Sequence, residues 1–282
     1  MKKIIITGTN GFIGKEFINL FNKKYEIIEV DLPFVDITKV KDINNLAKHK
    51  DIYSIIHLAA LSNPKDSFLN PKKYFEVNLF GTLNLLKLCV KNNINNFFLM
   101  SSLTIYGSSN KILNENSKIL PKHIYGTTKA AAEILCQTYS REYPININVL
   151  RPNLVIGSSK KPPDLINICV REALEHNKFT IFGDGEHIRD FVHVHDVCRA
   201  IECLIHYNKK FQAFCLGGNP LSINDLYNII KQKLNHVTIS SKPKNSSAFS
   251  LFCSNQKLQK SINFDLNISI EEMINKTITI YE

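Results

Sequence analysis

The sequence lacks the patterns that would place it in a membrane or around a metal ion. No stretch of its 282 residues is apolar for long enough to cross a bilayer, and the basic-then-apolar start MKKIII ends at Thr7-Gly8, too early for a signal peptide. Seven cysteines are present, but none forms a Cys-x-x-Cys pair or lies at metal-ligand spacing from a histidine. We therefore expect a soluble cytoplasmic protein with free, buried thiols, no membrane partner and no bound metal.

The charged residues also lack the clustering of a nucleic-acid-binding protein. Lysine and arginine outnumber aspartate and glutamate by 35 to 25, but the lysines are scattered, with no arginine–aromatic interleaving and no basic block. The sequence has no internal repeat and no low-complexity tract. We expect no nucleic-acid partner, and the net charge of +10 would instead help to attract an anionic nucleotide.

The first fourteen residues contain the strongest functional pattern. Lys2–Thr7 is predicted to be a short buried strand, and it runs into the segment GTNGFIG (8–14) and then an amphipathic helix. Strand, glycine turn and helix form a dinucleotide-binding loop when the helix N-terminus faces a pyrophosphate; an ordinary βα turn is the alternative. Gly8 would allow the tight turn, Gly11 the approach of the pyrophosphate, and Gly14 the close packing of the helix.

An acidic residue follows the second predicted strand. Tyr25–Val30 ends at Asp31, where dinucleotide folds place an acid that accepts hydrogen bonds from the adenosine ribose and repels a 2′-phosphate. Asp31 therefore favours NAD, although NADP is not excluded. A plain strand-end acid that starts a turn is the alternative.

Strands alternate with helical segments along the first half of the chain. Beyond the first two, strands are predicted at Ile52–Leu58, Asn96–Met100 and Asn146–Leu150, and a long helix begins at Pro71. This alternation predicts an α/β fold with a doubly wound parallel (Rossmann-like) sheet.

The pattern loosens from Arg151 onward. With 44% hydrophobic residues, the chain fits one α/β domain with a smaller C-terminal substrate-binding lobe better than two independent domains. We place the dinucleotide-binding domain at residues 1–152 and the lobe at residues 153–282, with the chain returning in part to the first domain.

A tyrosine and a lysine form the candidate catalytic pair. Tyr125 and Lys129 are four residues apart at the start of a predicted helix, so both side chains lie on one face. Hydride transfer at a sugar carbon requires a proton to move on the attached oxygen, and a tyrosine with a pKa of about 10 is a poor base at neutral pH. A lysine ammonium and an oxidised nicotinamide would lower that pKa, and Ser102 would orient the sugar hydroxyl. A surface tyrosine stacked on a lysine stem is the alternative.

Taken together, these motifs resemble the extended short-chain dehydrogenase/reductase family, in its branch of nucleotide-sugar epimerases, dehydratases and 4-ketoreductases. The segments that carry the resemblance are TGTNGFIG (7–14), SSLTIYG (101–107), YGTTK (125–129) and GDGEHIRDFVHVHDV (183–197), together with Asp31. The resemblance covers almost the whole chain. It implies a nucleotide-diphosphate sugar as substrate, NAD(P) as cofactor, catalysis by Ser102, Tyr125 and Lys129, and a homodimer formed by two long helices from each subunit.

The resemblance also implies a set of cofactor contacts. Asp36-Ile37 resembles an aspartate–apolar pair beside the adenine, and Leu58-Ala59-Ala60 would let the cofactor lie against backbone. Asn78 would face the cofactor side of the sheet, although a polar residue in a packed helix is the alternative. The predicted cofactor-binding residues are Gly8, Gly11, Phe12, Ile13, Asp31, Asp36, Ile37, Leu58, Ala59, Ala60, Asn78, Tyr125, Lys129 and Pro152.

The implied substrate contacts are Ser102, Asn153 and Arg189. The guanidinium of Arg189 is suited to grip the substrate diphosphate. A second phosphate-binding arginine that the family places near the C-terminal lobe is missing, and Lys242 or Lys244 would stand in for it.

Three further residues of the same segment are expected to be structural. Asp190, His193 and Asp196 would fix the loop and cap the following helix. His193 and His195 are not expected to bind a metal, because alternating positions on a strand point opposite ways.

Departures from the family pattern bear on the reaction. Dehydratases carry an acid pair where this chain has Leu103 and Thr104, which argues against dehydration. Leu154 occupies an asparagine position common in C4-epimerases, with Asn153 one place earlier, and Ser62 stands where those enzymes often carry a lysine.

The sequence therefore predicts an NAD(P)-dependent oxidoreductase acting at C4 of a nucleotide-linked sugar. Reduction of a 4-keto-(6-deoxy) sugar is the first choice and C4 epimerisation with tightly bound NAD the second, which Asp31 favours. A non-catalytic NAD(P)-binding sensor is the alternative of another class, but such a protein needs no Ser/Tyr/Lys proton shuttle. The nucleotide and the sugar are not identified.

Overall fold

Six parallel strands form the larger sheet of the computed structural model, which describes residues 1–157, 164–243 and 250–282. The sheet order is β2-β1-β3-β4-β5-β9. Several of these strands are continuous apolar runs, because helices cover both faces of the sheet. The strands are β1 (Lys2–Thr7), β2 (Tyr25–Val30), β3 (Ile52–His57), β4 (Asn96–Met100), β5 (Asn146–Pro152) and β9 (Gln212–Leu216). The predicted α/β class and doubly wound parallel sheet are confirmed.

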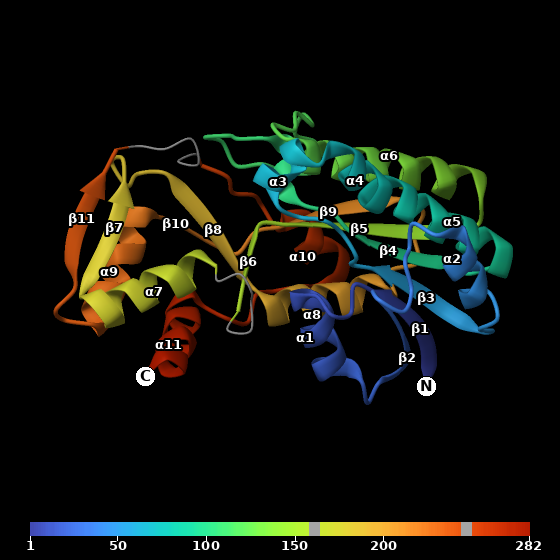
Figure 1. Cartoon of the computed structure of the whole chain (residues 1–282), viewed down its shortest axis with the longest axis horizontal. Coiled ribbons are helices and arrows are strands. Elements are labelled where there is room, and N and C mark those ends of the chain that lie inside the picture. Colours follow the sequence, from blue (N-terminus) through green and yellow to red (C-terminus); the bar gives the residue numbers. More distant parts are fainter. Residues whose placement is uncertain (158–163, 244–249) are drawn as a thin grey trace.

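Two groups of helices pack on opposite faces of this sheet (Figure 1). One face is covered by α1 (Phe12–Phe21), α8 (Val194–Leu204) and α10 (Gln256–Ile262). The other is covered by α2 (Val40–Leu46), α5 (Gly81–Asn92) and α6 (Ile124–Glu142). The chain runs from β1 to β2 on one side of β1 and then to β3 on its other side, so a crevice opens at the carboxyl ends of β1 and β3.

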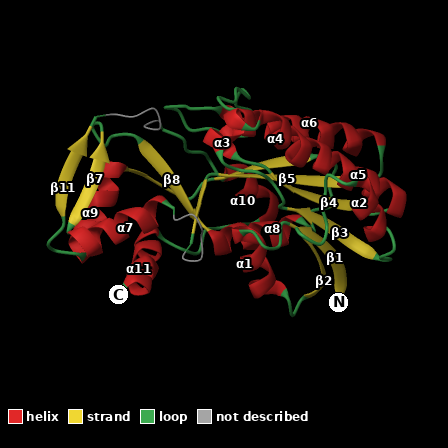
Figure 2. Cartoon of the chain, in the orientation of Figure 1, coloured by secondary structure: helices red, strands yellow, loops and turns green. Residues whose placement is uncertain are grey.

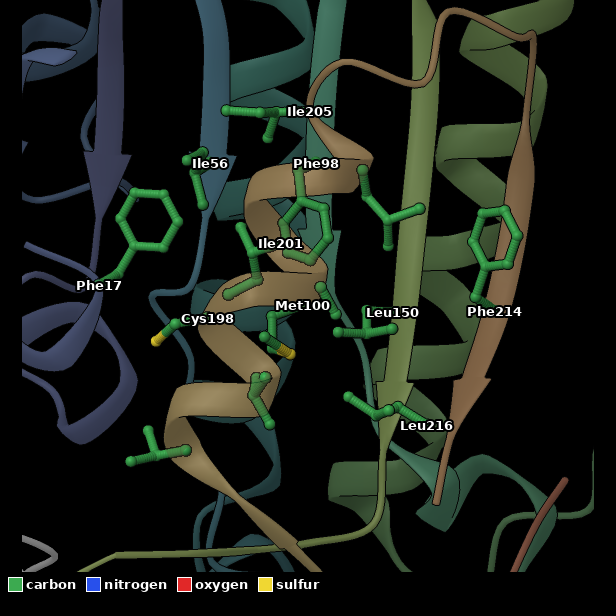
Figure 3. Close-up of a cluster of buried hydrophobic side chains, with 14 of the residues drawn as sticks. Phe17, Ile56, Phe98, Met100, Leu150, Cys198, Ile201, Ile205, Phe214 and Leu216 are labelled. Atoms are coloured by element: carbon green, nitrogen blue, oxygen red, sulfur yellow. The ribbon is translucent and has the colours of Figure 1, made fainter. Parts of the chain in front are cut away.

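The larger hydrophobic core lies between the sheet and α8. Figure 3 shows Ile201 of this helix beside Phe98 of β4, whereas the thiol of Cys198 points to the other side, toward α1. Phe214 of β9 belongs to the same cluster, so a strand from the second half of the chain completes the core of the first half.

The helix predicted to begin at Pro71 is interrupted by a wider turn. It runs as α4 (Pro71–Phe75), a π-helical turn η1 (Glu76–Phe80) and α5, and a short α3 (Pro64–Leu69) precedes it. A π-helical turn shifts the helical register by one residue and is often found at functional sites. Asn78 lies within this turn and is buried.

The smaller lobe is built from two short sheets and three helices (Figures 1 and 2). The sheets have the orders β10-β8-β6 and β11-β7. Their elements are β6 (Leu154–Ile156), β7 (Lys178–Phe182), β8 (Ile188–His193), β10 (Asn219–Ser222), β11 (Thr238–Lys242), α7 (Leu165–His176), α9 (Ile223–Lys233) and α11 (Ile270–Tyr281). Apolar residues of all three helices and of β7 and β8 form one core.

Residues beyond 152 contribute to both parts of the molecule. β6 leads into the lobe, whereas α8, β9 and α10 pack in or on the larger sheet. The predicted division at residue 152 thus coincides with the end of β5, and the chain then crosses between the two parts more than once. In the three described ranges, no helix is long and apolar enough to span a bilayer.

Candidate active site

The glycine loop has the close contacts that its sequence predicts. Gly8 has φ +77°, and a Cβ there would lie 2.6 Å from the backbone nitrogen of Ala59, so the turn passes directly against the loop that follows β3. A Cβ on Gly14 would overlap the Gly8 carbonyl oxygen. Gly14 therefore lets α1 pack on the turn itself rather than on the strand.

The start of α1 fits a cofactor diphosphate. Gly11 occupies the N-cap position, no side chain caps the helix, and its first turn contains no acidic residue. The first turn of the helix therefore supplies no carboxylate of its own that would compete with a phosphate for its N–H groups. The side chains of Phe12 and Ile13 pack against the hydrophobic core, so only their backbone can face a phosphate.

Asp31 ties the glycine loop to the end of β2. One carboxylate oxygen accepts a hydrogen bond from the backbone N–H of Asn10 at 2.7 Å, and the other accepts one from Leu32 at 2.8 Å. Each oxygen has a second lone pair, so the carboxylate can still accept ribose hydroxyls.

Asp36 and Ile37 lie in the segment between β2 and α2. Burial alone would raise the pKa of Asp36, but hydrogen bonds from the Thr38 hydroxyl and backbone N–H outweigh it and lower that pKa. The carboxylate is thus held as an acceptor. Ile37 is buried against Gly81, where a Cβ would lie 2.6 Å from its Cδ1.

Asn78 holds the loop after β3 against α6. Its side-chain oxygen accepts from the N–H of Leu61 at 2.9 Å, and its amide donates to the Leu61 carbonyl at 2.9 Å and to the Thr128 hydroxyl at 3.0 Å. These bonds fix the position of the loop that begins with Leu58, Ala59 and Ala60. Pro152, the last residue of β5, is buried at the same edge of the sheet.

The structure brings Ser102, Tyr125 and Lys129 together at the carboxyl end of β4. The Ser102 hydroxyl interacts with the Tyr125 phenol and accepts a hydrogen bond from the Thr104 hydroxyl at 2.9 Å. The Lys129 ammonium donates to the carbonyl of Met100 at 2.7 Å. All three predicted catalytic side chains are at least nine-tenths buried.

Burial opposes charge on both members of the Tyr/Lys pair. It raises the pKa of Tyr125 to about 12, and the hydrogen bond with Ser102 acts against this rise. It lowers the pKa of Lys129 to about 8, although the Glu133 carboxylate acts in the opposite direction. The sequence predicts a Tyr125 pKa lowered by Lys129; in the protein alone this prediction is wrong, because desolvation dominates.

Sequence reasoning missed two aromatic residues that border Tyr125. The ring of His123 stacks on Tyr125, with centroids 5.8 Å apart and planes 14° from parallel, and His123 caps α6 by accepting from the N–H of Gly126. Because His123 directly precedes the predicted helix, its position in the sequence indicated a capping residue. Tyr74, buried in α4, is close enough to raise the Tyr125 pKa, and its separation in sequence gave no signal.

Arg189 and Lys242 line one cavity in the smaller lobe. The cavity has a volume of about 370 Å³ and lies between α7 and the strands β7, β8 and β11. Burial lowers the pKa of the Arg189 guanidinium. The Lys242 ammonium lies 5.7 Å from the ring centroid of Phe182, which also lines the cavity. The other candidate cation, Lys244, lies outside the described residues.

Asn153 lies apart from this cavity. Its side-chain amide donates to the carbonyl of Leu251 at 2.7 Å, and it is hydrogen-bonded to Asp190. Asp190 also accepts from the backbone N–H groups of Gly218 and Cys253. These bonds join the segment after β5 to the chain near residue 251.

The histidines and acids of the 183–197 segment have structural partners. His193 caps α8 by accepting from the N–H of His195, and Asp196 accepts from the N–H groups of Asn267 and Ile268. The sequence argument that placed both histidines on a strand is wrong: His195 lies in α8, and the two rings meet edge to face at 4.7 Å. Within the described residues, no group of three or more His, Cys, Asp or Glu side chains could hold a metal ion.

Comparisons with known proteins agree with this arrangement. The chain is 30% identical to a putative UDP-glucose 4-epimerase of Methanocaldococcus jannaschii, over 98% of this chain and 97% of the relative. It is 30% identical to a UDP-glucuronate 4-epimerase of Thermodesulfobacterium geofontis, over 86% of this chain and 77% of the relative. The crystal structure of a UDP-glucose 4-epimerase from Thermotoga maritima, determined with UDP-glucose, superimposes with a TM-score of 0.90 at 25% identity and covers 99% of this chain and 98% of its own.

The match to a family model covers nearly all of the larger sheet and the first part of the smaller lobe. Residues 4–217, from β1 to the end of β9, match the model of the NAD dependent epimerase/dehydratase family. This range contains the glycine loop, the Ser/Tyr/Lys group and Arg189. The chain belongs to the NAD dependent epimerase/dehydratase family.

Proposed function

We propose that this protein is an NAD-dependent enzyme that acts at C4 of a UDP-linked sugar. The observation that carries the proposal is the clustering of Ser102, Tyr125 and Lys129, all at least nine-tenths buried, at the same sheet edge as the glycine loop. The full-length similarity to 4-epimerases supports the same reaction class. A sensor without catalysis would not require this buried group.

The roles of the chain's own residues follow from this geometry. When bound, NAD would supply a reversible hydride acceptor for the sugar carbon. Tyr125 takes the proton of the C4 hydroxyl and later returns it, and Ser102 orients that hydroxyl by hydrogen bonding. Lys129 contributes a positive charge that favours the phenolate, and an oxidised nicotinamide adds a second one.

Among the C4 reactions, epimerisation is the better supported. Dehydration would need acids at positions 103 and 104, but Leu103 is fully buried in a hydrophobic cluster and Thr104 hydrogen-bonds to Ser102. The sequence favours reduction of a 4-keto sugar. The order is reversed here because two relatives, aligned over 97% and 77% of their own lengths, are described as 4-epimerases. Reduction remains the second candidate, since Leu154 and Ser62 depart from the epimerase pattern.

We propose that the nucleotide end of the substrate occupies the cavity lined by Arg189 and Lys242. Two cationic side chains facing one cavity suit a diphosphate, and Phe182 and Leu165 supply apolar surface for a base. Lys242 would then take the place of the second phosphate-binding arginine, which this sequence lacks.

We also propose that the protein is a cytoplasmic homodimer. Phe80 of η1 and Ile134 of α6 are exposed large apolar side chains on neighbouring helices, and such surface is typical of a subunit interface. Two helices from each subunit would then form a four-helix interface.

Replacing Tyr125 by phenylalanine tests the catalytic assignment. Loss of the phenol removes proton transfer, so we expect kcat to fall about 10²- to 10⁴-fold. Binding of NAD, measured by calorimetry, should stay close to that of the unchanged protein, because the ring is retained. Tyr143→Phe, at an exposed position near the end of α6, is the matched control and should keep full activity. An unchanged rate in Tyr125→Phe would remove the catalytic assignment.

The cofactor content of the purified protein separates the two candidate reactions. An epimerase returns the hydride within each cycle, so we expect stoichiometric bound NAD and interconversion of UDP-glucose and UDP-galactose without added cofactor. Mass spectrometry of the released nucleotide and chromatography of the sugars measure this. A protein that instead consumes NADH or NADPH with a 4-keto sugar would be a reductase.

Arg189→Gln tests the diphosphate site. A hydrogen-bonded charge contact to the substrate is lost, so we expect KM for the UDP-sugar to rise about tenfold or more while kcat changes less. Arg141→Gln, at an exposed position in α6, is the matched control. Equal KM values for the two variants would rule out Arg189 as the diphosphate ligand.

Phe80→Glu tests the proposed dimer interface. A buried carboxylate at the interface would be costly, so we expect sedimentation analysis to show a monomer. Ile239→Glu, at an exposed position on β11, should leave the dimer intact. A monomeric unchanged protein would contradict the proposal.

A further inference from the structure

A buried ion pair lies directly beneath the Ser/Tyr/Lys group. The Glu133 carboxylate accepts from Arg151 through Nη2 at 2.5 Å and through Nε at 3.1 Å, and both side chains are almost completely buried. Arg151 also donates to the phenol of Tyr106. Burying such a pair is costly, and a hydrophobic pair of similar size often serves stability equally well. A role in the site would explain its presence there.

Three consecutive residues at the end of β4 each contact a side chain of α6. The carbonyl of Met100 accepts from Lys129, the hydroxyl of Ser101 donates to Glu133, and the hydroxyl of Ser102 interacts with the phenol of Tyr125. The α6 partners are spaced four residues apart, at positions 125, 129 and 133, so they lie along one helical face. The Ser101–Glu133 bond therefore fixes how the strand end, with Ser102, is set against Tyr125.

We propose that Glu133 is a positioning residue of the Ser/Tyr/Lys group: its carboxylate locks the end of β4 onto α6 and keeps the Lys129 ammonium charged. The proposal rests on the proposed function for its catalytic meaning. Glu133 touches neither of the proposed ligands and acts through Ser101 and Lys129.

The charge of Glu133 changes the pKa of Lys129 in a defined direction. Burial lowers the pKa of Lys129 to about 8, and the negative charge of Glu133 raises it. Since Lys129 is useful in its charged form, activity is present below this pKa and is lost as the pH rises through it. Removing the carboxylate charge lowers the pKa further, so the loss begins at a lower pH.

A hydrogen bond with Cys253 lowers the pKa of the Cys215 thiol, which lies 3.5 Å from the Tyr106 phenol. Four other titratable groups around Lys129 and Glu133 do not change charge near pH 8. These groups are His57 of β3, Tyr106 of η2 (Leu103–Tyr106), Cys136 of α6 and Arg151 of β5. Burial lowers the pKa of His57 to about 3 and raises the pKa values of Tyr106 and Cys136, so all three are neutral near pH 8. Burial alone would lower the pKa of Arg151, but the bonds to Glu133 outweigh it and raise that pKa, so Arg151 stays charged.

Glu133→Gln is the central test, because it keeps the size of the side chain and one acceptor oxygen for Ser101 while it removes the negative charge. We expect kcat at pH 7.5 to fall at least about tenfold and the alkaline limb of the pH profile to move down by about one pH unit. Glu133→Asp retains the charge and should keep that limb near its original position. A uniform loss of activity with no shift, or an upward shift, would overturn the proposal.

A measurement without substrate separates this inference from the proposed function. In protein labelled with ¹³C-lysine, Lys129 should titrate near pH 8, assigned by its absence in Lys129→Met, and about one unit lower in Glu133→Gln. If the unchanged protein converts no UDP-sugar, the proposed function fails while this titration still decides the charge role. An identical Lys129 titration in Glu133→Gln would overturn that role.

Two further variants test the proposal if Glu133→Gln does not fold. The double variant Glu133→Gln/Arg151→Met removes both buried charges and should show the same downward shift. Ser101→Ala removes only the bond from Ser101 to the carboxylate, so kcat should fall severalfold at an unchanged Lys129 pKa. If Ser101→Ala retains full kcat, Glu133 does not position the strand end.

Discussion

The structure depends on how firmly the end of β4 is attached to α6. Met100, Ser101 and Ser102 each have a partner on that helix, and the partners share one face. A strand end is normally followed by a mobile loop, but here three successive bonds hold the backbone and side chains where a reaction must take place. Ordered side chains lose no further conformational freedom when substrate arrives, which is the physical basis of a preorganised site.

The site is assembled from segments that meet only because parallel strands end at one edge. The glycine loop follows β1, Asp31 follows β2, the Leu58–Ala60 loop follows β3 and Ser102 follows β4. The contact of Gly8 with Ala59 and the bonds of Asn78 to Leu61 join neighbouring loops across this edge. In the smaller lobe, Arg189 on β8 and Lys242 on β11 line one cavity.

Burial shifts the pKa values of Tyr125 and Lys129 in opposite directions, and both shifts favour the neutral form. It favours the neutral phenol of Tyr125 and the neutral amine of Lys129, whereas proton transfer needs the charged forms within reach. The hydrogen bond from Ser102 and the charge of Glu133 act against burial at each position. The polar groups behind the site thus compensate for the loss of water around it.

Much of this was determined by sequence alone. Apolar runs, a glycine turn and residues spaced four apart are local patterns, so the parallel sheet, the loop at 8–14 and the shared face of Tyr125 and Lys129 could be predicted from them. Other features were decided only by tertiary structure: the Glu133–Arg151 pair, the stacking of His123, the π-helical turn at Asn78 and the attachment of Asn153 to Leu251. The raised pKa of Tyr125 belongs with them. The physical reason is that desolvation and long-range hydrogen bonds depend on which segments pack together, and no local spacing encodes that.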